Sequence, residues 1–153
     1  MLRKIFMSLL FLPFALGSCI DAGANTSRNG RRISFEQAME RVEDDASEIW
    51  IFSLESCPYC QKALPFVEQY IKDEREQRIY FIDRAALSDS QGKGLFLMMR
   101  DSFAQEDPAI AKGKILVPAI AALGNGKFIK AQTGFGQDRE SVYGNLSLFL
   151  ALI

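Results

Sequence analysis

The apolar residues of this chain recur at two different spacings, which together predict a mixture of helices and strands. Helical spacing runs over residues 34–46, where Ser34 followed three positions later by Gln37 is typical of a capping box. The same spacing returns from residue 58 to about 77 and again over 138–153. We therefore expect three helices, each burying one apolar face.

Continuous apolar runs predict the strands. The stretches 48–54 ("EIWIFSL") and 78–83 ("RIYFID") are short and suited to buried strands. Two further runs, 115–123 ("ILVPAIAAL") and 127–133 ("KFIKAQT"), are joined by Gly124-Asn125-Gly126. Asn-Gly between apolar runs is typical of a β-hairpin. The last two strands are therefore expected to pair.

The segment 85–114 lies between the second and third predicted strands. An apolar cluster suggests a helix there, and Asp107-Pro108 ends that helix or begins a new turn. The order of elements predicts an α/β domain with a mixed central sheet, flanked by helices, and a helical insert before the third strand. The cluster consists of Leu95, Phe96, Leu97, Met98, Met99 and Phe103.

Composition and charge exclude some classes of function. The 153 residues suit one domain, and 18 basic against 19 acidic residues leave no electrostatic basis for nucleic-acid binding. The chain has three cysteines and no histidine, which excludes a histidine general base and is too few ligands for an ordinary zinc site. We therefore expect no ordinary zinc site.

The N-terminus has the layout of a secretory signal peptide, predicted over residues 1–18. Arg3 and Lys4 precede an apolar run that is too short for a comfortable transmembrane helix. The sequence Leu-Gly-Ser-Cys ending at Cys19 resembles the bacterial lipobox, in which the cysteine becomes lipidated. Ordinary cleavage near the same place and an uncleaved anchor are the alternatives.

Residues 19–32 are predicted to be a lipidated cysteine with a flexible tether, and residues 33–153 the folded domain. The protein is then exported and anchored by lipid to a membrane, in the periplasm or at the cell surface. Asp21 does not directly follow Cys19, so the aspartate pattern for inner-membrane retention is absent. This favours the outer membrane in a bacterium with two membranes.

Cys57 and Cys60 lie two residues apart in "SLESCPYCQKALP". Cys57 falls at the exit of a predicted strand, and Cys60 in the first turn of the next helix. Unpaired N–H groups at a helix start favour a thiolate at Cys57, and Pro58 suits the first helical position. Cys57 is thus the candidate attacking nucleophile and Cys60 the candidate resolving thiol, in a compartment where disulfides form.

These residues make the chain resemble the thioredoxin superfamily over about 49–150. Cys-Pro-Tyr-Cys is typical of glutaredoxins and close to the Cys-Pro-His-Cys of Dsb-type oxidoreductases. Pro65 matches the proline that kinks the active-site helix, and Val117-Pro118 matches the cis-proline that faces the disulfide. The hairpin 124–127 and Gly134 after the last strand match as well.

The resemblance implies a thioredoxin fold and a monomeric thiol–disulfide oxidoreductase acting on exported protein substrates. It further implies a redox partner protein that supplies or removes electrons, and it implies no cofactor. The catalytic residues would be Cys57 and Cys60, and the substrate-binding residues Pro58, Tyr59, Val117 and Pro118. The direction of electron flow stays open, because reductases and oxidants share this scaffold.

The chain also departs from the family. Ile51 stands where thioredoxin has a buried aspartate, so proton handling would rely on water or on Glu55. The loop 133–138 only loosely echoes the glutathione-binding loop of glutaredoxins, so glutathione is not the expected partner. Two other functions remain open: a lipid-anchored binding or chaperone module without redox turnover, and delivery of a soft metal ion with help from Met98 or Met99.

Overall fold

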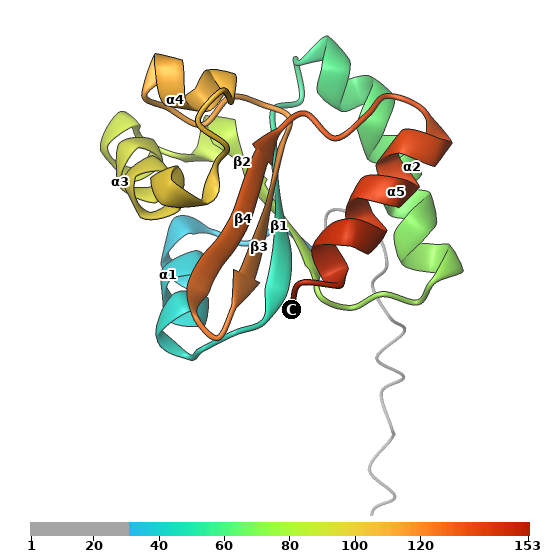
Figure 1. The fold of residues 1–153 in the computed structure, drawn as a ribbon, viewed down its shortest axis with the longest axis horizontal. Helices are drawn as coiled ribbons and strands as arrows, with labels where there is room; N and C mark the ends of the chain where they lie inside the picture. Colours follow the sequence, from blue (N-terminus) through green and yellow to red (C-terminus); the bar gives the residue numbers. More distant parts are fainter. Residues whose placement is uncertain (1–30) are drawn as a thin grey trace, which may run out of the picture.

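The computed structural model describes residues 31–153 (Figure 1). The predicted signal peptide, Cys19 and all but the last two residues of the predicted tether lie outside this range. The elements follow in the order α1 (Phe35–Glu43), β1 (Glu48–Ser53), α2 (Pro58–Asp73), β2 (Ile79–Asp83), η2 (Arg84–Ala86), α3 (Asp89–Met99), η3 (Arg100–Ser102), α4 (Pro108–Lys112), β3 (Ala119–Gly124), β4 (Lys127–Thr133) and α5 (Arg139–Leu150).

The four strands form one mixed sheet in the order β2-β1-β3-β4. β1 and β2 are parallel, whereas β1 pairs with β3 and β3 pairs with β4 in antiparallel fashion. Asn125 and Gly126 both adopt positive φ at the β3–β4 connection, which is the geometry of a tight hairpin turn. The predicted mixed sheet and hairpin are therefore confirmed.

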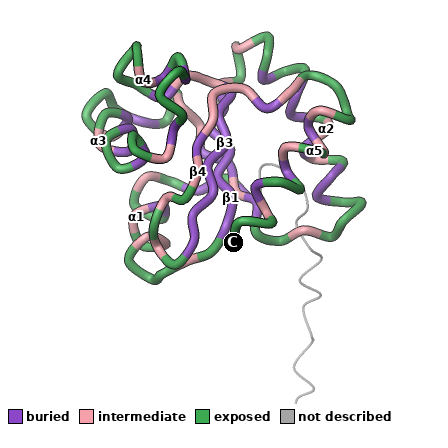
Figure 2. The backbone as a smooth tube through the Cα atoms, viewed as in Figure 1, coloured by how far each residue is buried: buried purple, intermediate pink, exposed green. Residues whose placement is uncertain are grey.

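Helices cover both faces of the sheet (Figure 1). Trp50 and Phe52 of β1 pack in a core with α1 and α3, whereas Ile49 and Ile51 pack in a second core with α2 and α5. Successive side chains of a strand point to opposite faces, so one continuous apolar strand supplies both cores. Figure 2 accordingly shows β1 and β3 as buried along their length.

Local sequence explains the helix ends. Ser34 and Gln37 form the predicted capping box at the start of α1. α2 ends at Asp73, four residues before the predicted end, because Arg75 adopts a left-handed φ of 51° and turns the chain away. β3 begins only at Ala119, later than predicted, since Pro118 has no N–H for the sheet ladder.

The helical insert between β2 and β3 is present, and it covers the outer edge of β4. Phe103 forms a parallel bridge with Ala131, and the Ser102 hydroxyl donates to the Phe128 carbonyl at 2.9 Å. An exposed strand edge invites pairing with other chains. The insert therefore protects this edge while bringing its own residues beside the end of β4.

Arg31 and Arg32, the last two residues of the predicted tether, contact the domain at the edge of β2. The Arg31 guanidinium donates to the Gln77 carbonyl at 3.0 Å, and Arg32 bridges to Phe81 and pairs with Asp83 at 3.6 Å. The ordered contacts of the domain thus begin before residue 33. Among the helices of residues 31–153, none is long and apolar enough to cross a membrane.

Candidate active site

Cys57 lies at the junction of β1 and α2, as the sequence predicted. After β1 ends at Ser53, a turn closed by the Cys57 N–H and the Leu54 carbonyl at 3.0 Å leads into the helix. Cys57 is the N-cap of α2, with Pro58 at the first helical position. Its sulfur accepts a hydrogen bond from the Cys60 N–H at 3.4 Å, so the helix start directs a backbone donor at this sulfur.

The two cysteines differ in exposure. Both are free thiols, and Cys57 is partly exposed whereas Cys60 is completely buried in the core under α2. Burial raises the pKa of the Cys60 thiol to about 12, and negative charge at Cys57 contributes to the rise. Cys60 is therefore a protonated thiol at neutral pH, and of the two sulfurs that of Cys57 is the more accessible from outside.

The segment before β3 lies directly against Cys57. The Val117–Pro118 peptide bond is cis, as the resemblance implied. The Cys57 thiol donates a weak hydrogen bond to the Val117 carbonyl, with 3.7 Å between sulfur and oxygen. Antiparallel pairing of β1 with β3 brings these segments together across sixty residues of sequence.

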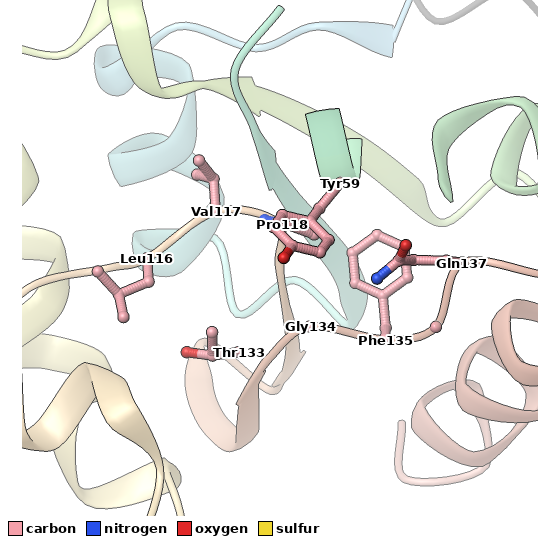
Figure 3. Close-up of a pocket in the computed structure, with 9 residues that line it drawn as sticks. Tyr59, Leu116, Val117, Pro118, Thr133, Gly134, Phe135 and Gln137 are labelled. Atoms are coloured by element: carbon pink, nitrogen blue, oxygen red, sulfur yellow. The ribbon is translucent and has the colours of Figure 1, made fainter. Parts of the chain in front are cut away.

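A cleft of about 500 Å³ opens beside this contact (Figure 3). Tyr59, which is 57% exposed, comes from the start of α2; the other walls are the segment before β3 and the loop after β4. Three of the four predicted substrate-binding residues line it, whereas Pro58 lies exposed nearby and is not part of the lining. The lining residues are Tyr59, Leu116, Val117, Pro118, Thr133, Gly134, Phe135, Gly136 and Gln137.

The loop after β4 is held in place by backbone contacts. The Gly134 N–H donates to the Pro118 carbonyl at 2.7 Å, which joins two walls of the cleft. Gly136 has a φ of 101° and lies so close to Ser141 that a Cβ would overlap it. The Asn145 side chain donates to the Phe135 carbonyl at 3.2 Å. This wall is therefore fixed by contacts within the domain itself.

Sequence analysis did not identify Asp107 as part of this region. Its carboxyl group accepts hydrogen bonds from both the backbone and the hydroxyl of Thr133, the residue at which the loop wall begins. It also caps α4. Asp-Pro is a sequence pattern for a helix start, so the cap was foreseeable, but the Thr133 partner 26 residues away was not. Leu116 and Phe135 were likewise missed as cleft walls.

The lining of the cleft does not include Ile51, Glu55, Trp50 or Pro65. Ile51 is fully buried, so the position of the thioredoxin aspartate is apolar. Glu55 is exposed, and its backbone carbonyl accepts from the Gln61 side chain at 3.0 Å. Trp50 is a core residue, and its indole N–H donates to the buried Glu48 at 2.6 Å. Pro65 lies inside α2, where the resemblance expected a proline.

Metal ligands do not gather within the described part of the chain: residues 31–153 contain no group of three or more Cys, Asp or Glu side chains placed to hold an ion. Met98 is 45% exposed on α3, whereas Met99 is buried in the core.

No family model and no curated protein sequence matches this chain, but solved structures do. A protein described as having a thioredoxin fold, for which an oxidoreductase role has been suggested, aligns over 78% of this chain and 96% of its own, with a TM-score of 0.55 and 14% identity. Thioredoxin from Aeropyrum pernix aligns over 76% of this chain and 84% of its own, with a TM-score of 0.50 and 16% identity. Thioredoxin f2 from Chlamydomonas reinhardtii aligns over 76% of this chain and 94% of its own, with a TM-score of 0.50 and 14% identity.

Proposed function

We propose that the protein is a thiol–disulfide oxidoreductase that acts on exported protein substrates. Its domain has the thioredoxin fold, an α/β architecture with a mixed sheet flanked by helices, here extended by the helical insert. One observation carries the proposal: a partly exposed Cys57 at a helix start, backed by the buried thiol of Cys60, lies against Val117 beside a cleft. This arrangement can expose one sulfur to a partner while it keeps the second for resolution.

In the reducing direction, the Cys57 thiolate attacks one sulfur of a substrate disulfide. A mixed disulfide forms, and the other substrate sulfur leaves as a thiolate. Cys60 then attacks the Cys57 sulfur, which releases the second substrate thiol and leaves a Cys57–Cys60 disulfide; two electrons have passed to the substrate. A redox partner protein restores the dithiol, and the oxidising reaction is the same sequence in reverse.

Cys60 must lose its proton before it attacks. In the mixed disulfide Cys57 carries no charge, so the contribution of that charge to the raised pKa of Cys60 disappears. Since Ile51 is apolar, the departing substrate thiolate or water accepts the proton. The buried resolving thiol thus becomes reactive after the first step, which limits premature reaction with outside disulfides.

Reduction of insulin disulfides by dithiothreitol tests the proposal. The wild type accelerates the reaction, and Cys57→Ser abolishes the acceleration. Reduced Cys60→Ser, mixed with insulin after dithiothreitol has been removed, accumulates a mixed disulfide with the substrate. Equal rates for wild type and Cys57→Ser would refute the proposed enzymatic activity. A binding or chaperone module of the same fold would then be the remaining function.

The direction of electron flow is set by the reduction potential. We propose a potential less negative than the roughly −270 mV of thioredoxin, because Cys-Pro-Tyr-Cys resembles the less reducing members of the superfamily. Equilibration of the Cys57–Cys60 pair with glutathione buffers measures it. A value as negative as that of thioredoxin would favour a reductase and overturn this part of the proposal.

The site of action rests on the N-terminal sequence alone. We propose that residues 1–18 are removed and that lipid on Cys19 anchors the protein to a membrane outside the cytoplasm. The wild type should then sediment with membranes, and Cys19→Ala should be released or left unprocessed. Wild-type protein found wholly in the soluble fraction would contradict the anchor and leave simple secretion.

A further inference from the structure

Asp107 belongs to the insert but binds the end of β4. Its Oδ2 accepts from the Thr133 N–H at 2.8 Å, and its Oδ1 accepts from the Thr133 hydroxyl at 2.7 Å and from the Ala109 N–H at 2.9 Å. The residue is only 8% exposed. Three donors converge on this buried carboxyl group, so it is held in one geometry.

The two partners of Asp107 lead to two neighbouring walls of the cleft. Ala109 belongs to α4, and the chain that leaves α4 supplies Leu116 and Val117. Thr133 begins the other wall, which continues through Gly134 and Phe135 (Figure 3). A single side chain therefore couples the insert to the loop after β4.

We propose that Asp107 is a positioning residue that holds the insert, and with it Leu116, in place against Thr133 at the cleft where an extended peptide segment binds. The proposal rests on the proposed function, because that segment would carry the cysteine that reacts with Cys57. Lys, Arg, Asp and Glu are absent from the residues that line the cleft, and the partly exposed Leu116 and Val117 and the ring of Tyr59 present apolar surface. The preferred segment therefore has an apolar side chain beside its cysteine.

Asparagine cannot replace Asp107 in this role. Its single oxygen can accept from two of the three donors, and its NH₂ group would then face the third donor without an acceptor. A hydrogen bond to a charged acceptor is stronger than one to a neutral acceptor, so the loss is large enough to loosen the link. Asp107→Asn keeps the shape of the side chain while it removes the charge and one of the two acceptor oxygens.

A single-turnover exchange reaction tests the role of Asp107. In a Cys60→Ser background, reduced Cys57 attacks the peptide sulfur of a short peptide whose cysteine is disulfide-linked to thionitrobenzoate. A protein–peptide disulfide forms and coloured thionitrobenzoate leaves, so one disulfide replaces another and no outside oxidant is needed. The same protein reacts with Ellman's reagent, which has no peptide, as the reference.

The background protein is expected to prefer the peptide with leucine beside its cysteine over the peptide with aspartate there. Asp107→Asn should raise the half-saturating concentration of the leucine peptide roughly fivefold, in line with about 1 kcal/mol of lost binding. The limiting rate and the rate with Ellman's reagent should stay unchanged. Asp101→Asn is the matched control, because this insert aspartate is 88% exposed and pairs only with its neighbour Arg100.

Thr133→Val tests the same link if Asp107→Asn does not fold, since it removes one donor and keeps the backbone bond. It should shift the half-saturating concentration in the same direction by a smaller factor. Unchanged peptide saturation in the folded variants, or equal changes with peptide and Ellman's reagent, would overturn the role of Asp107. Because the exchange with the peptide does not depend on insulin turnover, a failure of the proposed function would be detected separately, in the insulin assay.

Discussion

The sulfur of Cys57 lies 3.7 Å from the carbonyl oxygen of Val117, which accepts its thiol hydrogen. This contact places the partly exposed cysteine against the segment that enters β3, whereas Cys60 lies behind it in the core. The two thiols therefore meet different surroundings although only two residues separate them.

Iodoacetamide should alkylate Cys57 much faster than Cys60 in the reduced, folded protein. With a pKa of about 12, the Cys60 thiol at pH 8 is ionised in only about one molecule in ten thousand, and its sulfur is buried. Timed alkylation of reduced protein lacking Cys19, followed by peptide mass spectrometry, measures both rates. Denatured protein is the control, in which both cysteines should react at similar rates. Similar rates in the folded protein would contradict the buried position of Cys60.

The raised pKa of Cys60 should make the reduced protein less stable in alkali. A cysteine in the unfolded chain titrates near pH 8.5. The contribution of the Cys60 thiol to the free energy of unfolding is therefore fully present below that pH and is lost as pH rises toward about 12. The free energy of unfolding should fall by about 2 kcal/mol between pH 7 and pH 10 from this group alone. Urea denaturation of the wild type and of reduced Cys60→Ala measures the difference.

The oxidised wild type is a second control for the alkaline prediction, because a disulfide has no thiol to titrate. Its loss of stability between the same two pH values should be smaller than that of the reduced protein. A reduced wild type whose stability falls in parallel with that of Cys60→Ala would show that Cys60 does not titrate abnormally.

Alanine should be tolerated less well at Gly136 than at Gly134, although both residues have positive φ. At Gly134 a Cβ meets no atom within 4 Å, so the cost is the conformational one of about 1–2 kcal/mol. At Gly136 a Cβ would also overlap Ser141, which adds roughly 1–3 kcal/mol. Urea denaturation of the two variants tests the order. Equal losses would mean that the loop moves freely away from α5.

Arg41→Met should destabilise the protein more than Arg100→Met. Arg41 contacts the buried Glu48 at 2.6 Å, and its removal leaves that carboxyl group with the Trp50 indole as its side-chain partner. Because Arg41 is itself partly exposed, we expect a loss of about 2 kcal/mol, below the full value for a buried pair. Arg100 pairs with Asp101 on the surface, where about 0–1 kcal/mol is expected. Thermal unfolding of the two variants measures their losses of stability. Equal losses would show that the contact of Arg41 with Glu48 contributes no more than the surface pair.

Much of the local structure could be predicted from sequence because short-range interactions determine it. The capping box of Ser34 and Gln37 depends on residues three positions apart, and the hairpin turn depends on Asn125 and Gly126 alone. Placing Cys57 where a strand meets a helix needed only the change in apolar spacing around it. The mixed sheet followed from the order of these elements.

Tertiary structure alone decided how the walls of the cleft meet. The contacts of Asp107 with Thr133 and of Cys57 with Val117 join residues far apart in the chain. The distance between such residues depends on how the strands pair, on the path of the insert and on where each side chain points, none of which leaves a local pattern. The burial of Cys60, and with it the raised pKa of its thiol, arises in the same way: α2 and its neighbours exclude water from a residue whose sequence identifies it only as the second cysteine of a pair.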